Sequence, residues 1–206
     1  MPWRIDPRVF VTEQNYPQGV KLGVDVGMVR VGLASCDPDG ILATPVKTLS
    51  RDTKKNSDIK VVVKEATTRG AQQIFVGLPR TMKGEEKASA HMARGYAQHL
   101  ANMLAAAGQN VPVRLVDERL TTVSAHQALR QAGLDSREHR KVVDQVAAVE
   151  ILQHALDMQK ARNSDVGELV RAVKSGVVGT ADSPEDEEGL TIISSSNAPV
   201  DMHEAP

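Results

Sequence analysis

The sequence predicts one α/β domain built on a mixed five-stranded sheet with helices on both faces. Residues 21–27 alternate cleanly between apolar and polar positions, and residues 30–36 and 41–49 follow as two further strands. From residue 59 onward, helical spacing alternates with short apolar segments. Strand–helix–strand units of this kind produce parallel strands. We therefore expect an antiparallel three-stranded meander that continues into a parallel portion.

Each expected element has its own signal. Asp37-Pro38-Asp39-Gly40 is a strong turn between the second and third strands. The first helix shows apolar residues at helical spacing from 59 to 66, and Gly70 stops it. Residues 73–76 form the fourth strand, 85–107 a long helix, and 111–116 the fifth strand. Thr122 caps a short helix to about residue 131, and the last helix runs from about 138 to 158.

Three segments of different character divide the chain of 206 residues. Residues 1–19 contain three prolines and no sustained period, so we expect an N-terminal extension. Residues 20–160 form the folded domain. Residues 161–206 are expected to be a largely disordered acidic tail, because from residue 180 onward acidic, Ser, Pro and Ala residues leave little apolar surface to bury.

Charge and composition narrow the classes of function. Residues 180–206 hold seven acids and no Lys or Arg, which leaves 25 basic and 19 acidic residues, a net charge of +6, on residues 1–179. A mildly basic body is compatible with a polyanionic partner.

No segment reaches the ~18 apolar residues of a membrane span, and the N-terminus lacks the apolar core of a signal peptide. We expect a cytoplasmic protein, no membrane partner, and a monomer or weak homodimer. The single cysteine, Cys36, is expected to be a small buried apolar residue.

Asp25 is the first candidate for chemistry. It lies on a predicted core strand and shares a face with Gly23 and Gly27, while Leu22, Val24 and Val26 face the other way. A carboxylate in such a place is costly to bury unless a cation or hydrogen bonds stabilise it. The two glycines leave room for a ligand or another backbone to approach closely. A carboxylate that bonds a nearby turn is the structural alternative.

Two further acids stand at element ends. Asp117 and Glu118 follow an apolar strand at its carboxyl end, where ligand sites gather in sheets with parallel strands. Asp144 leads a stripe of small and apolar residues along the last helix. Strand alternation leaves open which member of the 117/118 pair faces Asp25, and side-chain reach favours Glu118 as the ligand. Asp117 is then a supporting or alternative acid.

Three acids on three elements are typical of an oxygen-ligand site for a hard cation such as Mg²⁺ or Mn²⁺. We therefore predict that Asp25, Glu118 and Asp144 are both metal ligands and catalytic residues. The sequence has no His-x-His or His-Glu-x-x-His pattern, which argues against zinc, and no P-loop, which argues against that type of nucleotide site.

Four ordered motifs resemble one protein family. Gly23-Val24-Asp25-Val26-Gly27 with Arg30-Val31-Gly32, Val76-Gly77-Leu78-Pro79 with Gly84, Asp117 to Thr122, and Lys141 to Asp144 are similar to those of YqgF-type proteins, also called RuvX. These are Holliday-junction-resolvase-like nucleases of bacteria, and the resemblance covers residues 20–157. It implies an RNase H-like fold and a role in maturing the 5′ end of the pre-16S ribosomal RNA precursor. The pre-ribosome is then an expected partner, and resolution of Holliday junctions is the alternative activity.

Four basic residues are expected to contact nucleic-acid phosphates: Arg30, Arg80, Lys83 and Arg119. Arg80 and the Met82-Lys83-Gly84 segment depart from the family pattern, in which an apolar residue follows the proline and Met-Asp-Gly comes soon after.

Two other classes of protein share part of this pattern. An actin-like kinase also begins with Asp-x-Gly on a strand but needs two such domains, and this chain has one. A non-catalytic nucleic-acid binder of the sheet-stacking type needs aromatic residues on exposed strands, and the chain has only five aromatic residues in all.

Overall fold

The computed structural model describes residues 14–81, 83–117 and 137–173, with side chains in the last helix from residue 145. The strands are β1 Lys21–Val26, β2 Arg30–Cys36, β3 Ala43–Ser50, β4 Gln73–Leu78, β5 Val113–Asp117 and β6 Glu168–Val170. The helices are α1 Ser57–Arg69, α2 Ala88–Ala106 and α4 Arg137–Arg162.

The sheet confirms the predicted α/β class of RNase H-like type and adds one strand. Its order is β3-β2-β1-β4-β5-β6. β1, β2 and β3 form the expected antiparallel meander, whereas β1, β4 and β5 run parallel. The prediction of five strands was wrong by one, because β6 pairs antiparallel with β5 over only three residues. A three-residue strand is too short to show an alternating period in the sequence.

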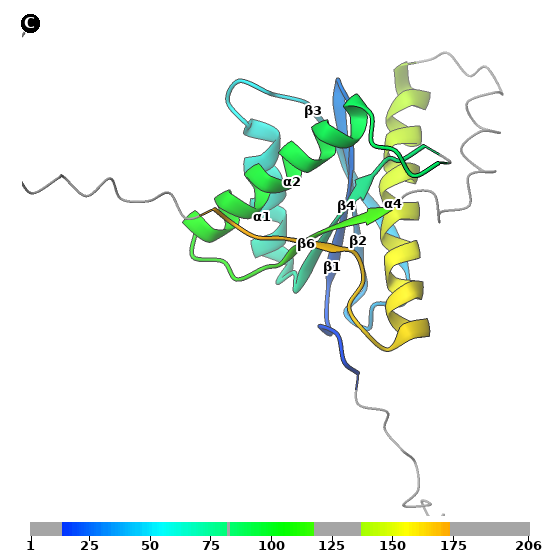
Figure 1. Ribbon diagram of the computed structural model, residues 1–206. Helices are drawn as coiled ribbons and strands as arrows, with labels where there is room; N and C mark the ends of the chain where they lie inside the picture. Colours follow the sequence, from blue (N-terminus) through cyan, green and yellow to red (C-terminus); the bar gives the residue numbers. More distant parts are fainter. Residues whose placement is uncertain (1–13, 82, 118–136, 174–206) are drawn as a thin grey trace, which may run out of the picture. The chain divides into compact units, whose positions relative to one another are not determined.

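Helices cover both faces of the sheet, as expected (Figure 1). α1 and α2 pack on the face that carries Leu22, Val24 and Val26. α4 packs on the opposite face, against Phe75 and Val116. Two separate apolar cores therefore sandwich the sheet.

Several boundaries differ from those predicted. α2 begins at Ala88 rather than at residue 85, because residues 80–86 close a loop through a backbone bridge between Arg80 and Glu86. Beyond the predicted domain end at residue 160, α4 continues to Arg162 and the chain returns to add β6. At the other end, Asn15 donates a backbone hydrogen bond to Asn163 Oδ1 at 3.2 Å, so the expected N-terminal extension touches the domain. The predicted helix at 122–131 and the tail beyond residue 173 lie outside the described residues.

Cys36 is buried, as predicted, and its sulfur accepts a hydrogen bond from the Lys21 backbone N–H at 3.1 Å. Burial raises the pKa of this thiol. Of the helices in the described ranges, none is long and apolar enough to cross a membrane.

Candidate functional site

Asp25 lies one residue before the end of β1, half-buried, and is paired with Gly32 of β2. It shares its face with Gly23, which lies directly against α4. A Cβ atom on Gly23 would sit 2.6 Å from Leu152 Cβ and 2.7 Å from the Ala148 carbonyl oxygen. The close approach that the glycine pattern predicted is therefore made at Gly23 by the backbone of α4.

The direction of α4 decides which of its residues lie near Asp25. A Cβ at Gly40 would contact both Lys21 Nζ and Leu156 Cδ2, so the start of β1 lies near Leu156. Two residues along β1, Gly23 contacts Leu152 and Ala148. The helix thus runs antiparallel to β1. Position 144, one helical turn before Ala148, falls toward the end of β1 that carries Asp25. The side chain of Asp144 is outside the described residues.

Asp117 ends β5, where it is paired with Leu78 of β4. Val116 packs in the core on the α4 side, whereas Leu115 packs in the core with α1 and α2. Strand alternation therefore directs Asp117 away from the face of Asp25. Its carboxylate lies 3.9 Å from Arg80 Nη1. Glu118 lies outside the described residues.

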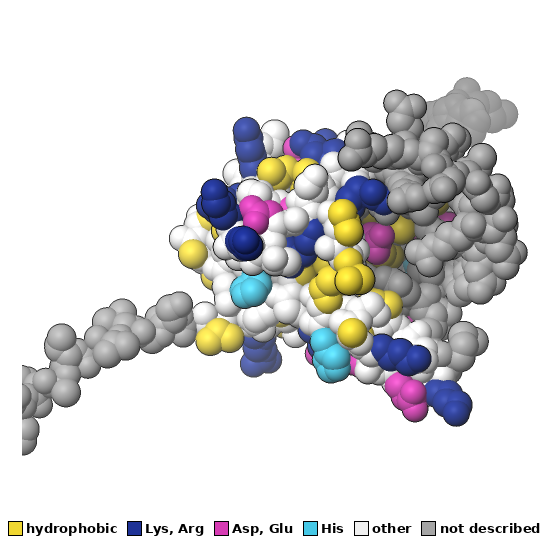
Figure 2. Space-filling view, turned by 90° about the horizontal axis from the view of Figure 1, so that it is seen from above, with side chains coloured by type: hydrophobic (Ala, Val, Ile, Leu, Met, Phe, Trp, Pro, Cys, Tyr) yellow, Lys and Arg dark blue, Asp and Glu magenta, His cyan; other side chains and the backbone are white. Residues whose placement is uncertain are grey.

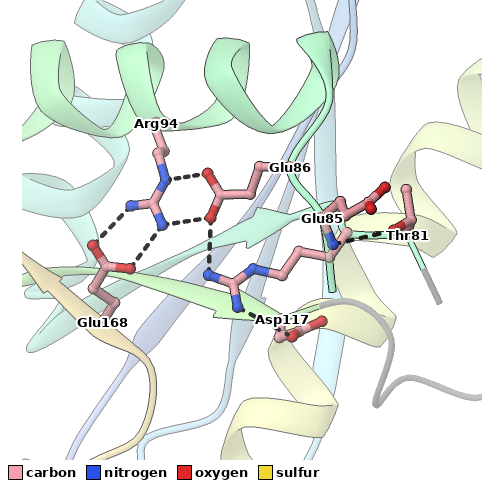
Figure 3. A network of polar contacts seen from close by, with 7 residues as sticks. Thr81, Glu85, Glu86, Arg94, Asp117 and Glu168 are labelled. Carbon is pink, nitrogen blue, oxygen red and sulfur yellow. Dashed lines mark hydrogen bonds and ion pairs between the residues drawn. The ribbon is translucent and has the colours of Figure 1, made fainter. Parts of the chain in front are cut away.

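Arg80 belongs to an ion-pair network that the sequence did not predict (Figure 3). Its guanidinium donates a 2.9 Å hydrogen bond to Glu86, and Glu86 also accepts two bonds from Arg94 at 2.7 Å. Arg94 in turn holds Glu168 of β6 through bonds of 2.7 and 2.9 Å. Because Arg94 and Glu168 are 74 positions apart, no local spacing could have revealed the pair.

The charges in the network stabilise one another. The Arg94 guanidinium, with a smaller contribution from Arg80, lowers the pKa of Glu86 to about 2. The same guanidinium lowers the pKa of Glu168, and Glu86 and then Glu168 raise the pKa of Arg94. Glu86, Glu168 and Arg94 are therefore all favoured in their charged forms.

The four predicted phosphate contacts have different surroundings. Lys83 is exposed, and Arg30 at the start of β2 is half-buried. Arg80 forms ion pairs with Glu86 and Asp117. Arg119 lies outside the described residues. In Figure 2, which views the molecule from above Figure 1, Lys and Arg side chains are spread over the visible surface with a few Asp and Glu side chains among them. Within the ranges that the structure describes, no three metal-ligating side chains come together.

Comparison with known proteins identifies the family. A family model described as RuvX, Holliday junction resolvase, matches residues 19–158. The chain belongs to the RuvX family. The match includes Asp25, Asp117, Glu118 and Asp144, so all four predicted acids lie in the part that defines RuvX proteins.

Relatives of this RuvX chain share one name. A protein of Frankia casuarinae named "Putative pre-16S rRNA nuclease" is 44% identical over 187 residues, covering 91% of this chain and 83% of the relative. A protein of the same name from Kineococcus radiotolerans is 50% identical over 142 residues, covering 69% and 73%. The family description and the relatives' name both denote enzymes that cut nucleic acid, so the chain belongs to a family of nucleases.

Among solved structures, RuvC of Thermus thermophilus in complex with a Holliday junction covers 74% of this RuvX chain and 100% of its own, at 16% identity and a TM-score of 0.47.

Proposed function

We propose that this RuvX protein is a divalent-metal-dependent nuclease of the cytoplasm that hydrolyses phosphodiester bonds during 5′-end maturation of pre-16S rRNA. The observation that carries the proposal is Asp25, a half-buried carboxylate near the end of a central strand, on the face along which α4 runs toward position 144. The name of the relatives supports the choice of substrate. The pre-ribosome is the corresponding partner.

The residues in question suit Mg²⁺ or Mn²⁺. Gly23 and Gly27 stand two positions before and after Asp25 in the sequence, so these two positions carry no side chain that would crowd its carboxylate. Asp25, Glu118 and Asp144 would supply only carboxylate oxygens, which hard cations prefer. When bound, such ions activate a water molecule and stabilise the leaving oxygen of a phosphodiester.

The two neighbouring acids, Asp117 and Glu118, have different roles in this proposal. Asp117 is directed away from the face of Asp25 and lies near Arg80, which supports a role in holding the end of β5. We therefore assign the ligand role to Glu118, the next residue in the chain. The phosphate contacts fall to Arg30, Lys83 and Arg119. Arg80 would have to leave its pair with Glu86 to join them.

The second candidate substrate is branched DNA, which the family model's description favours. The discriminating experiment offers one preparation a pre-16S transcript and a four-way DNA junction side by side, with Mg²⁺, with Mn²⁺ and with EDTA. We expect metal-dependent cutting of the transcript. Preferential cutting of the junction would show that the protein is a Holliday junction resolvase. Cutting in the presence of EDTA would contradict the proposed metal dependence.

Asp25→Asn tests the site itself. The amide is nearly isosteric, so the variant should fold with an unchanged circular dichroism spectrum. It should lose divalent-dependent cleavage by a factor of at least ~100 because it removes one anionic ligand. Wild-type activity in a folded Asp25→Asn preparation would exclude Asp25 as a metal ligand.

A further inference from the structure

The family match ends at residue 158, yet the chain continues into β6 and ties this strand back to the candidate site. The connection is made by Arg94 of α2, which contacts both Glu168 of β6 and Glu86. Its Nη1 and Nη2 atoms hold the two carboxylate oxygens of Glu168, and its Nε and Nη2 atoms hold those of Glu86. Arg94 therefore forms two-pronged contacts on both sides. Such contacts fix orientation as well as distance.

Glu86, held by Arg94, in turn contacts a small loop. Residues 80–86 are closed at their base by the Arg80–Glu86 bridge and by the Arg80 Nη2–Glu86 Oε1 hydrogen bond of 2.9 Å. Within the loop, the Thr81 N–H donates to the Glu85 carbonyl at 3.0 Å, and the Gly84 N–H donates to the Thr81 carbonyl at 2.7 Å. Hydrogen bonds thus hold the described residues 80, 81 and 84–86 together, and Lys83 beside them is exposed.

The other terminal nitrogen of the Arg80 guanidinium faces Asp117. Its Nη1 atom lies 3.9 Å from Asp117 Oδ2, longer than a hydrogen bond but within ion-pair range. Figure 3 shows Glu168, Arg94, Glu86 and Asp117 in one continuous series of polar contacts. The series begins on β6 and ends on the residue before Glu118.

We propose that Arg94 and Glu168 are positioning residues for substrate binding: they hold the 80–86 loop against the end of β5, so that Arg80 faces Asp117 and Lys83 is presented to a substrate phosphate. This inference rests on the proposed nuclease function. An isolated exposed ion pair contributes little to stability, but a network of two-pronged arginine contacts sets geometry. Small displacements of binding groups have large effects on catalysis.

Glu168→Gln and Arg94→Lys test the proposal on whichever substrate the wild-type protein cuts. Each should raise KM on the order of tenfold, below the ~100-fold that a 1 Å misplacement can cost, with kcat little changed. Lysine keeps the positive charge of Arg94 but cannot form bidentate hydrogen bonds with two carboxylates at once. Arg94→Lys should therefore not restore substrate binding. Arg69→Gln is the matched control. Arg69 forms an i,i+4 ion pair with Glu65 at the C-terminal end of α1, away from the site. Breaking this pair should leave KM unchanged.

Coupling to Lys83 separates positioning from a general loss of stability. In a Lys83→Ala background, Glu168→Gln should raise KM by less than about twofold, because the phosphate-binding side chain that the loop positions is then already absent. A full tenfold effect in that background would overturn the proposal. So would a KM unchanged by Glu168→Gln.

Hydrogen exchange tests the positioning without any substrate. In the free protein, Glu168→Gln should speed exchange of the Thr81 and Gly84 amide hydrogens and leave that of the α1 amides unchanged. Unchanged protection of the loop amides would contradict the proposal even if activity fell. If the wild-type protein cuts neither nucleic acid, the proposed function fails, and the exchange result still decides whether β6 orders the loop.

Discussion

At the scale of single residues, Gly23 determines how closely α4 can approach the sheet. The glycine pattern around Asp25 predicted room for a ligand or for another backbone, and at Gly23 the structure shows a backbone. A Cβ there would lie 2.7 Å from the Ala148 carbonyl oxygen, too close for any real contact. The absence of one side chain thus lets the helix that carries Asp144 lie along β1.

Gly23→Ala should therefore destabilise the fold, by about 1–3 kcal/mol, because helix and strand must separate to fit one methyl group. Gly95→Ala on α2 is the control, since nothing lies within 4 Å of its added Cβ. That change should stabilise by roughly 0.5–1 kcal/mol, because alanine loses less backbone entropy than glycine in a helix. Chemical denaturation of both variants measures the difference. Equal stability of the two variants would contradict the close contact.

The assignment within the acid pair is also decided at this scale. We expect Glu118→Gln to remove most cleavage activity with little change in melting temperature. Asp117→Asn should lower the melting temperature and reduce activity only partly, because it weakens the contact with Arg80. Melting curves and cleavage rates of the two variants distinguish these roles, and the opposite pattern would transfer the ligand role to Asp117.

At the scale of elements, the entry into α1 depends on a side chain outside the helix. The Asp52 carboxylate accepts hydrogen bonds from the Lys54 and Lys55 backbone N–H groups and from the Ser57 hydroxyl. Asn56, the residue before the helix, has a positive φ of 51° and makes no capping bond with its side chain. Asp52 therefore orders the turn that would otherwise lack a cap.

These bonds predict a pH dependence. The Ser57 hydroxyl and the Lys55 amide lower the pKa of Asp52 to about 2, from an ordinary value of 3.8. A lowered pKa in the folded state stabilises the protein above pH 3.8, and the stabilisation is lost as the pH falls from 3.8 through about 2. Asp52→Asn should thus melt below the wild type at pH 7, and the gap should close near pH 2. A gap that is constant with pH would show that ionisation of Asp52 does not matter.

At the scale of the whole molecule, the residues after α4 complete the sheet. Val166 is buried, and Asp165 accepts bonds from Arg114 Nη2 and from the side-chain amides of Gln73 and Gln159. This segment lies beyond the matched family region, and its strand β6 pairs with residues 113–115 of β5.

Two truncations test this boundary. Ending the chain after Arg162 removes β6 and leaves the Gln73, Arg114 and Gln159 side chains without Asp165, so the melting temperature should fall markedly. Ending it after Val173 should leave the melting temperature nearly unchanged, because the acidic sequence beyond has little apolar surface to bury. Thermal melts of both truncated proteins check this. A large loss after the second truncation would show that the tail packs on the domain.

The elements whose signals are local could be predicted from the sequence alone. Alternation predicted the β1–β2–β3 meander, helical spacing and Gly70 predicted α1 and its end, and the glycines around Asp25 marked a place of close approach. Each signal depends on residues a few positions apart, whose period follows from strand or helix geometry.

Features that depend on residues far apart in the chain could not be predicted in this way and are seen only in the folded structure. The structure shows that α4 runs antiparallel to β1, that Arg80 Nη1 lies 3.9 Å from Asp117, and that β6 adds a sixth strand to the sheet. It also brought Arg94 and Glu168 together across 74 positions. Pairing across such distances depends on how whole elements pack, and a single sequence shows no period for it.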